Sequence, residues 1–181
     1  MASVNDHGHA LWVPFWFSYM RRPPAADRRH TARADADYSS LIKPLGGSLA
    51  TVEAFAGVYN YVHRPTDLPL GTDLFVFRSG VLPMWEDAAN AAGGRLTLRV
   101  RKGVSARVFE EMVLRLVGGT LQPRASLCGV SVSVRLSHDA LWINTADDAV
   151  ISRCRLEASK DLPGSTSASH WEFKRHVHEG A

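Results

Sequence analysis

The chain has 181 residues, and 45% of them are hydrophobic, which fits one globular domain with its own core and excludes global disorder. The formal net charge of +3 permits an anionic partner but excludes a histone-like basic coat. We therefore treat residues 1–181 as a single domain and expect a monomer.

The first predicted element is a buried strand over Ala10–Met20. This apolar run is too short to span a bilayer and Pro14 interrupts it, so we expect no membrane partner. Residues 21–37 are rich in Arg, Ala, Asp and Pro and show no hydrophobic periodicity, which predicts a long flexible basic loop. This loop is either a solvated insertion, the commoner case for charge runs, or an arm that reaches RNA.

Apolar residues at helical spacing predict an amphipathic helix over Thr51–Val62, with Thr51 as its N-cap. A short strand at Leu74–Phe77 follows and ends in a turn at Ser79-Gly80. Strict alternation in Arg95–Arg101 predicts a strand with leucines on one face and arginines on the other. Ser105–Val117 is predicted to be a helix that ends at Gly118-Gly119.

Residues Val130–Leu136 alternate again and form a predicted hairpin with Leu141–Thr145 across a turn at residues 137–139. Ala146–Ser159 is a third predicted helix, and Trp171–Val177 is a closing strand in a weakly defined segment that starts at about residue 163. Hairpin-linked strands with helices between them indicate an α+β fold, with one antiparallel sheet and helices packed on a single face.

Cys128 and Cys154 are far apart and have no metal-type spacing, which favours two small core residues in a reducing cytosol or nucleus. The sequence contains no nucleophile elbow, no glycine-rich phosphate loop before a helix and no paired-carboxylate motif. We therefore expect neither an enzyme nor a resident metal or cofactor.

The segment Pro83-Met84-Trp85-Glu86-Asp87 places a large aromatic face beside a carboxylate. A positively charged purine would stack on the indole, and the carboxylate would accept hydrogen bonds from the purine edge. A neutral guanine would gain less from either contact. On residue types alone, however, a core Trp beside a solvated Glu is the commoner arrangement.

The order and spacing of several segments resemble the translation initiation factor 4E family, whose members bind the 5′ cap of mRNA. The resemblance runs from about His9 to about Pro163 and implies a curved sheet with three helices on its convex face and the cap on its concave face. It rests on five segments: Thr51-Val52-Glu53-Ala54-Phe55, Pro83-Met84-Trp85-Glu86-Asp87, Gly93-Gly94-Arg95, Cys128-Gly129-Val130 leading to Arg135, and Leu141-Trp142-Ile143.

The resemblance also implies roles for individual residues. Trp85 would be one ring of an aromatic sandwich around 7-methylguanine, and Glu86 would accept the guanine N1 and N2 protons. The family's second sandwich Trp is missing, and Tyr38 is our expected replacement, as in a divergent branch of the family that includes repressors. Trp142 would touch the N7 methyl group.

The phosphate ligands follow from the same resemblance. Arg135 would be the chief triphosphate ligand, because a guanidinium fork matches phosphate geometry, and Arg95 would support it. His138 stands where the family usually has a phosphate-binding lysine, so its contribution would grow as the imidazole becomes protonated.

On the convex face, the family uses a helical Trp to bind scaffold and inhibitor proteins. Ala56 stands at that position, and Glu110 replaces a usual leucine, so only Val52 and the His9-Ala10 pair match the family's contact. Because an indole anchor is a typical hot spot, its loss predicts an atypical contact with an initiation scaffold or inhibitor protein. This divergence is similar to that of the kinetoplastid paralogues of the family.

The resemblance thus implies a cytoplasmic or nuclear factor that binds capped mRNA in translation initiation. Two alternatives stay open: a cap-bound translational repressor, which Tyr38 and Ala56 favour, and a protein-interaction scaffold with weak cap binding, which His138 favours.

Overall fold

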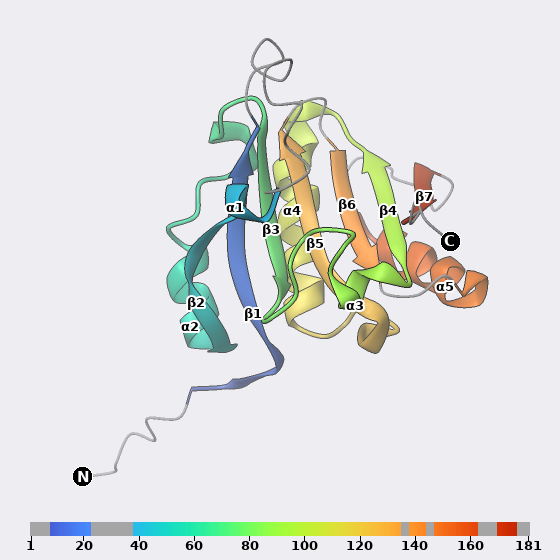
Figure 1. Ribbon diagram of the computed structural model, residues 1–181, viewed down its shortest axis with the longest axis horizontal. Coiled ribbons are helices and arrows are strands. Elements are labelled where there is room, and N and C mark those ends of the chain that lie inside the picture. Colours follow the sequence, from blue (N-terminus) through green and yellow to red (C-terminus); the bar gives the residue numbers. More distant parts are fainter. Residues whose placement is uncertain (1–7, 23–37, 135–137, 144–146, 163–169, 177–181) are drawn as a thin grey trace.

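A computed structural model describes residues 8–22, 38–134, 138–143, 147–162 and 170–176 (Figure 1). Most of the predicted basic loop, at residues 23–37, and the start of the C-terminal segment, at 163–169, lie outside these described residues. None of the helices in the described ranges is long and apolar enough to cross a membrane.

The described strands form one sheet in the order β2-β1-β3-β5-β6-β4-β7, and every pairing is antiparallel. The sheet therefore begins and ends with the edge strands β2 and β7. The strands are β1 (Ala10–Arg21), β2 (Lys43–Thr51), β3 (Thr72–Arg78), β4 (Gly94–Arg99), β5 (Leu127–Val134), β6 (His138–Ile143) and β7 (Trp171–Arg175).

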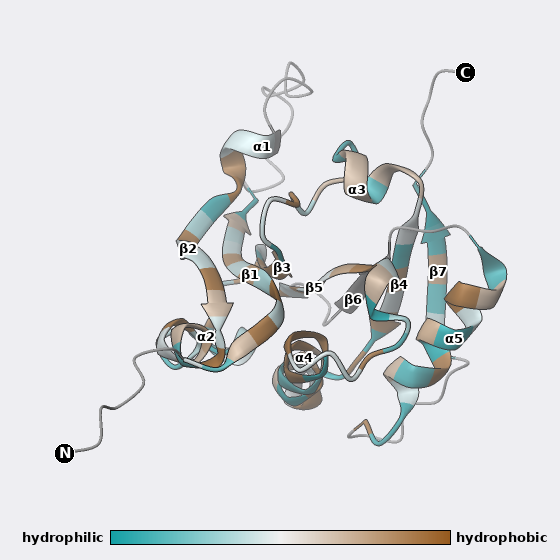
Figure 2. Cartoon of the chain, turned by 90° about the horizontal axis from the view of Figure 1, so that it is seen from below, coloured by the Kyte–Doolittle hydropathy of each residue, from teal (hydrophilic) through white to brown (hydrophobic). Residues whose placement is uncertain are grey.

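The longer helices lie together on one side of the sheet, here called the helix face (Figure 2). The short helices α1 and α3 stand on the other side, here called the loop face because the β3–β4 connection also lies there. The helix-face helices are α2 (Val52–Tyr59), α4 (Lys102–Val117) and α5 (Asp148–Ser159); the others are α1 (Tyr38–Leu41), α3 (Ala88–Ala91) and the single turns η3 (Pro65–Asp67) and η4 (Arg124–Ser126).

Local sequence signals explain where the helix-face helices begin and end. The Thr51 hydroxyl accepts a hydrogen bond from the Ala54 amide and so caps α2, as predicted. Asp147 caps α5 in the same way. Helix α4 ends at Gly118, and Gly119 follows with a φ of +68°, a conformation that glycine adopts without a Cβ penalty.

The core consists of two clusters, one on each face of the sheet. The larger cluster fills the space between the helix face and α2, α4 and α5 and includes Leu96 and Leu98, which are fully buried. The smaller cluster lies on the loop face and contains Met20, Phe75, Phe77 and Cys128. Cys128 and Cys154 are both free and buried, and burial raises the pKa of each thiol to about 11. The expectation that the cysteines are core residues is confirmed.

The α+β fold class is confirmed, with two local corrections. The strand β2 was not predicted, because Lys43-Pro44-Leu45-Gly46-Gly47 shows no apolar alternation, and β2 pairs only with β1 at the sheet edge. The predicted turn at residues 137–139 is also wrong in part. His138 already belongs to β6, where it pairs with Ser133, because backbone pairing with β5 continues beyond the apolar residues of β6.

Candidate functional site

The β3–β4 connection carries Trp85 and Glu86 and leaves the sheet through a tight turn. Gly80 has a φ of +86°, which confirms the predicted turn at Ser79-Gly80, and the Val81 amide donates to the Arg78 carbonyl. The Trp16 indole of β1 then donates its Nε1 proton to the Val81 carbonyl at 3.1 Å. The start of the connection is therefore attached to the loop face of the sheet.

Asp87 and Asn90 brace the connection from behind. The two Asp87 carboxylate oxygens accept from the amides of Leu82 (2.8 Å) and Ala89 (2.9 Å), so this one side chain caps α3 and closes the loop. Asn90 is fully buried, and its amide group donates to the carbonyls of Leu82 (2.7 Å) and Met84 (2.8 Å). Two polar side chains, the half-buried Asp87 and the buried Asn90, thus fix the backbone on both sides of Trp85.

Trp85 and Glu86 are the exposed part of this braced β3–β4 connection, residues 79–93, here called the Trp85 loop. The Trp85 side chain is 43% exposed, and Glu86 is exposed as well. This exposure argues against a core Trp, the commoner arrangement for the residue type, because a core residue would be buried. An exposed aromatic face and an adjacent carboxylate on a fixed backbone can stack on a flat ring and accept its edge protons.

Arg95 and Trp142 are direct cross-strand neighbours. Arg95 of β4 pairs with Trp142 of β6, and Trp142 pairs with Gly129 of β5, which in turn pairs with Phe77 of β3. The paired residues form one line across the sheet, and Arg95 lies on its loop face because it alternates with the buried Leu96. The register therefore brings two of the predicted ligand residues, Arg95 and Trp142, to adjacent positions.

Gly129 lies under the Phe77 ring on this line. A Cβ atom at Gly129 would stand 2.4 Å from the Phe77 ring carbons and 2.7 Å from the Val76 carbonyl oxygen, closer than packed atoms approach one another. Only glycine fits at this position. Because Gly129 has no side chain, the Phe77 ring can pack directly against the sheet under the Trp85 loop.

The remaining predicted ligand residues are placed by their backbone or lie outside the described residues. Tyr38 is the first residue of α1, which stands on the same side of the sheet as α3 (Figure 2). His138 begins β6 and pairs with Arg99 of β4 as well as with β5. Arg135 lies outside the described residues.

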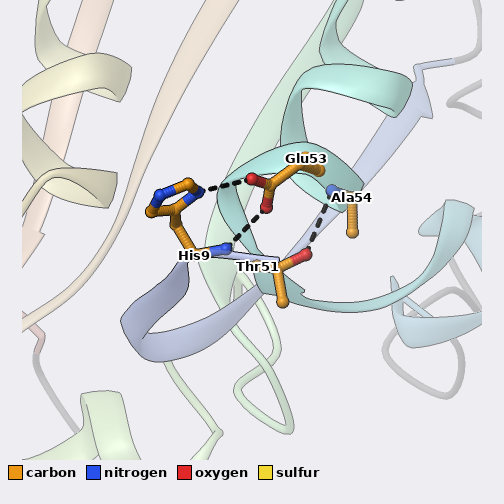
Figure 3. A network of polar contacts seen from close by, with 4 residues as sticks. All are labelled: His9, Thr51, Glu53 and Ala54. Atoms are coloured by element: carbon orange, nitrogen blue, oxygen red, sulfur yellow. Dashed lines mark hydrogen bonds and ion pairs between the residues drawn. The ribbon is translucent and has the colours of Figure 1, made fainter. Parts of the chain in front are cut away.

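On the helix face, His9 lies against the first turn of α2, where it contacts Glu53 (Figure 3). The Val52 amide donates to the His9 carbonyl at 2.8 Å, while the His9 amide and Nδ1 contact the two carboxylate oxygens of Glu53 at 2.8 and 2.7 Å. The Glu53 carboxylate raises the pKa of His9, and the hydrogen bond from His9 lowers the pKa of Glu53. Glu53, which the sequence analysis did not single out, thus fastens the start of β1 to the start of α2.

Ala56 lies on α2, and Glu110 on α4 belongs to a polar region of the same face. The Glu110 carboxylate accepts from the Tyr59 hydroxyl at 2.9 Å and lies 3.3 Å from the Arg64 guanidinium, which also stacks on the Tyr59 ring and donates to its hydroxyl. Burial and the neighbouring carboxylate raise the pKa of Tyr59 to about 12. We call Tyr59, Arg64 and Glu110 the polar trio; it lies between α2 and α4, where the resemblance implied a leucine.

Two exposed hydrophobic residues lie on α2 and α4, the helices that carry Tyr59 and Glu110 of the polar trio. Val52 on α2 is 48% exposed and Leu114 on α4 is 51% exposed. The helix face therefore presents exposed apolar side chains, Val52 and Leu114, as well as the charged residues of the polar trio. Among the described residues, no group of three His, Cys, Asp or Glu side chains stands close enough together to hold a metal ion.

Known proteins resemble this chain in sequence and in fold. Residues 10–180 match the protein-family model described as Eukaryotic initiation factor 4E. Eukaryotic translation initiation factor 4E-4 of Caenorhabditis elegans is 35% identical over 181 residues, which cover 97% of this chain and 80% of the relative. Eukaryotic translation initiation factor NCBP of Oryza sativa subsp. japonica is 39% identical over 142 residues, which cover 77% of this chain and 59% of the relative.

Solved structures share the fold at lower identity. The complex of Ascaris suum eIF4E-3 with m2,2,7G cap has a TM-score of 0.80 at 23% identity and covers 97% of this chain and 94% of that one. The complex of C. elegans eIF4E-3 with the 4E-binding protein Mextli and cap analog has a TM-score of 0.79 at 24% identity, with 93% and 92% covered. These matches confirm the fold of an antiparallel sheet with three main helices.

The relatives named here come from nematodes and a plant, so they give no support to the placement among kinetoplastid paralogues. They do support a divergent position, because even the nematode relative that spans nearly the whole chain shares only 35% of its residues. Since the family match covers residues 10–180, the chain belongs to the eukaryotic initiation factor 4E family.

Proposed function

We propose that this chain binds the 7-methylguanosine 5′ cap of mRNA and acts in translation initiation. Membership of the initiation factor 4E family supports this proposal, as do the solved Ascaris suum relatives, which hold an m7G cap and an m2,2,7G cap. The observation that carries it is the 43% exposure of Trp85 on a loop that Asp87 and Asn90 fix from behind.

In this proposal Trp85 and Glu86 recognise the base. Methylation at N7 makes the purine cationic, which strengthens its stacking on an indole, and each such contact contributes about 1–3 kcal/mol. A bidentate contact from Glu86 to the guanine N1 and N2 protons adds about 1–3 kcal/mol of discrimination, by analogy with base readout in DNA. Tyr38 supplies the second ring, which is smaller than an indole, and Trp142 contacts the methyl group.

The triphosphate is held by Arg135, with Arg95 and His138 in support. The cross-strand pairing of Arg95 with Trp142 supports this role, because Arg95 and the residue proposed to touch the base are neighbours in the sheet. His138 contributes more at low pH, since only the protonated imidazole attracts phosphate.

Fluorescence quenching with 7-methyl-GTP and GTP tests the proposal. We expect 7-methyl-GTP to bind more tightly than GTP, and Glu86→Ala to remove most of the affinity. Glu157→Ala is the matched control, because Glu157 lies on α5 on the helix face, where it pairs with Lys160. Equal affinity of the wild type for the two nucleotides would refute cap binding. So would an unchanged affinity of the Glu86→Ala variant for 7-methyl-GTP. Failure to remain on cap resin would instead favour the protein-interaction scaffold.

A second candidate is a cap-bound repressor that occupies the cap without recruiting the usual scaffold. The polar trio favours it, because Glu110 and Ala56 replace the apolar anchors that the scaffold helix needs. An affinity purification on cap resin tests this candidate. Recovery of a large initiation scaffold together with the chain in polysome fractions would refute repression, whereas cap-dependent inhibition of translation by the added chain would support it.

A further inference from the structure

We propose that Lys174 on the edge strand β7 binds the phosphodiester backbone of the RNA that follows the cap. The inference rests on the proposed cap binding and extends it past the triphosphate. It gives a function to the edge strand β7, which none of the cap contacts described above involves. Its ligand is a single-stranded, anionic polynucleotide attached to the cap.

The strand register places Lys174 beside the proposed phosphate ligands. Arg95 pairs with Trp142 on one side and with Lys174 on the other. Because neighbouring strands lie about 4.8 Å apart, the three residues stand in one line at adjacent positions. Lys174 therefore continues the line from the base-contacting residue through the phosphate-contacting residue to the edge of the sheet.

The alternation of β7 puts Lys174 on the loop face. Trp171 is buried and Phe173 packs against the main core on the helix face, whereas Glu172 and Lys174 are exposed. Lys174 thus shares its face with Arg95, which alternates with the buried Leu96 in the neighbouring strand.

The backbone at Lys174 is closely attached to the base of the Trp85 loop. A Cβ atom at Gly94 would stand only 2.5 Å from the Lys174 carbonyl oxygen, so the two backbones approach as closely as glycine allows. Beyond Lys174, the His176 amide donates to the Gly93 carbonyl at 3.1 Å. Gly93 and Gly94 connect α3 to β4, so the β3–β4 connection that carries Trp85 meets β7 at Lys174.

The charge at Lys174 is available to a ligand. Lys174 is an exposed residue, and no ion pair of Lys174 is found within the described residues. Arg99 adds a second exposed cation on the same face of β4, and Glu172, opposite Thr97, is the local carboxylate. A flexible ammonium group is a point charge and suits a phosphodiester that has no fixed orientation, whereas a guanidinium suits the defined triphosphate.

The experiment compares 7-methyl-GTP with a short capped oligoribonucleotide over a range of salt concentrations. We expect the wild-type chain to bind the capped oligonucleotide more tightly than 7-methyl-GTP. Lys174→Ala should lower the affinity for the oligonucleotide about two- to fivefold, the size of an exposed charge contact, and leave 7-methyl-GTP unchanged. The slope of log affinity against log salt should fall by about 0.7 for the oligonucleotide, the value for one phosphate on a single strand.

Matched variants separate charge at this position from charge in general. Lys160→Ala removes one positive charge just after the end of α5, a helix on the helix face, and should change neither affinity. Glu172→Gln removes the nearby carboxylate and should strengthen binding of the oligonucleotide alone. If Lys174→Ala binds each ligand as tightly as the wild type does, this inference is refuted and the proposed cap binding is unaffected. An equal loss for both ligands would also refute it, because Lys174 would then act on the cap itself. Absence of 7-methyl-GTP binding by the wild type would refute the proposed function.

Discussion

The bracing of the Trp85 loop makes Asn90→Ala the most informative substitution. The variant loses two hydrogen bonds, from the Asn90 amide to the carbonyls of Leu82 and Met84. Both carbonyls keep a backbone donor, the Met84 amide for Leu82 and the Asp87 amide for Met84, so neither becomes an orphaned buried group. The cost is therefore close to the net value of two hydrogen bonds, about 1–3 kcal/mol.

Two measurements test this reasoning. Urea denaturation should show a lower free energy of unfolding by about 2 kcal/mol. Affinity for 7-methyl-GTP should fall by up to about tenfold, since about 1.4 kcal/mol of lost preorganisation corresponds to a factor of ten. Asn60→Ala is the matched control, because Asn60 is exposed at the end of α2. If Asn90→Ala has the same free energy of unfolding as the control, the Asn90 hydrogen bonds do not stabilise the loop. If the free energy of unfolding falls but the affinity for 7-methyl-GTP does not, cap binding does not depend on the braced loop.

Three further substitutions or titrations probe other parts of the chain. Gly129→Ala should destabilise the fold by about 1–3 kcal/mol, because its Cβ would collide with Phe77; a wild-type denaturation midpoint would contradict the close packing. The His9–Glu53 pair should contribute most between about pH 4.5 and 6.5: the raised pKa of His9 means its contribution fades as pH rises through that value, and the lowered pKa of Glu53 means its contribution fades as pH falls. An NMR titration of the His9 ring should show a pKa that moves toward its ordinary value in Glu53→Gln. Tyr59 should ionise near pH 12, so that stability falls as pH rises above its ordinary value of 10; absorbance that shows every tyrosine ionising near pH 10 would contradict this.

The elements that the sequence predicted well are those with strong hydrophobic periodicity. In β4, the alternation of leucines with polar residues identified both the strand and the face that carries Arg95. Helices α2 and α4 were predicted from the same kind of pattern, with Thr51 and the Gly118-Gly119 pair as their limits. The family also confirms the expectation of a non-enzymatic factor. Local pattern was sufficient here because each element buries one face.

The features that the sequence did not predict depend on contacts between distant segments. Asn90 has an ordinary helical context, and nothing local indicates that its amide reaches back to Leu82 and Met84. Glu53 contacts His9 across 44 positions of sequence, and a carboxylate in the first turn of a helix is usually explained by the helix dipole alone. The edge strand β2 has little apolar alternation, because its pairing with β1 rather than burial specifies it.

The polar trio changes the meaning of Glu110. In the sequence, a glutamate where the family has a leucine indicates a damaged binding surface. In the structure, the carboxylate of Glu110 accepts a hydrogen bond from the Tyr59 hydroxyl and forms an ion pair with Arg64. The negative charge of Glu110 therefore has partners within the chain. An apolar partner helix that covers this region would have to displace or bury these contacts, and a buried ion pair rarely repays its desolvation. A helix that places a polar side chain over the trio and an apolar one beside Val52 and Leu114 would avoid that cost, which is a different requirement from the one that a leucine surface imposes.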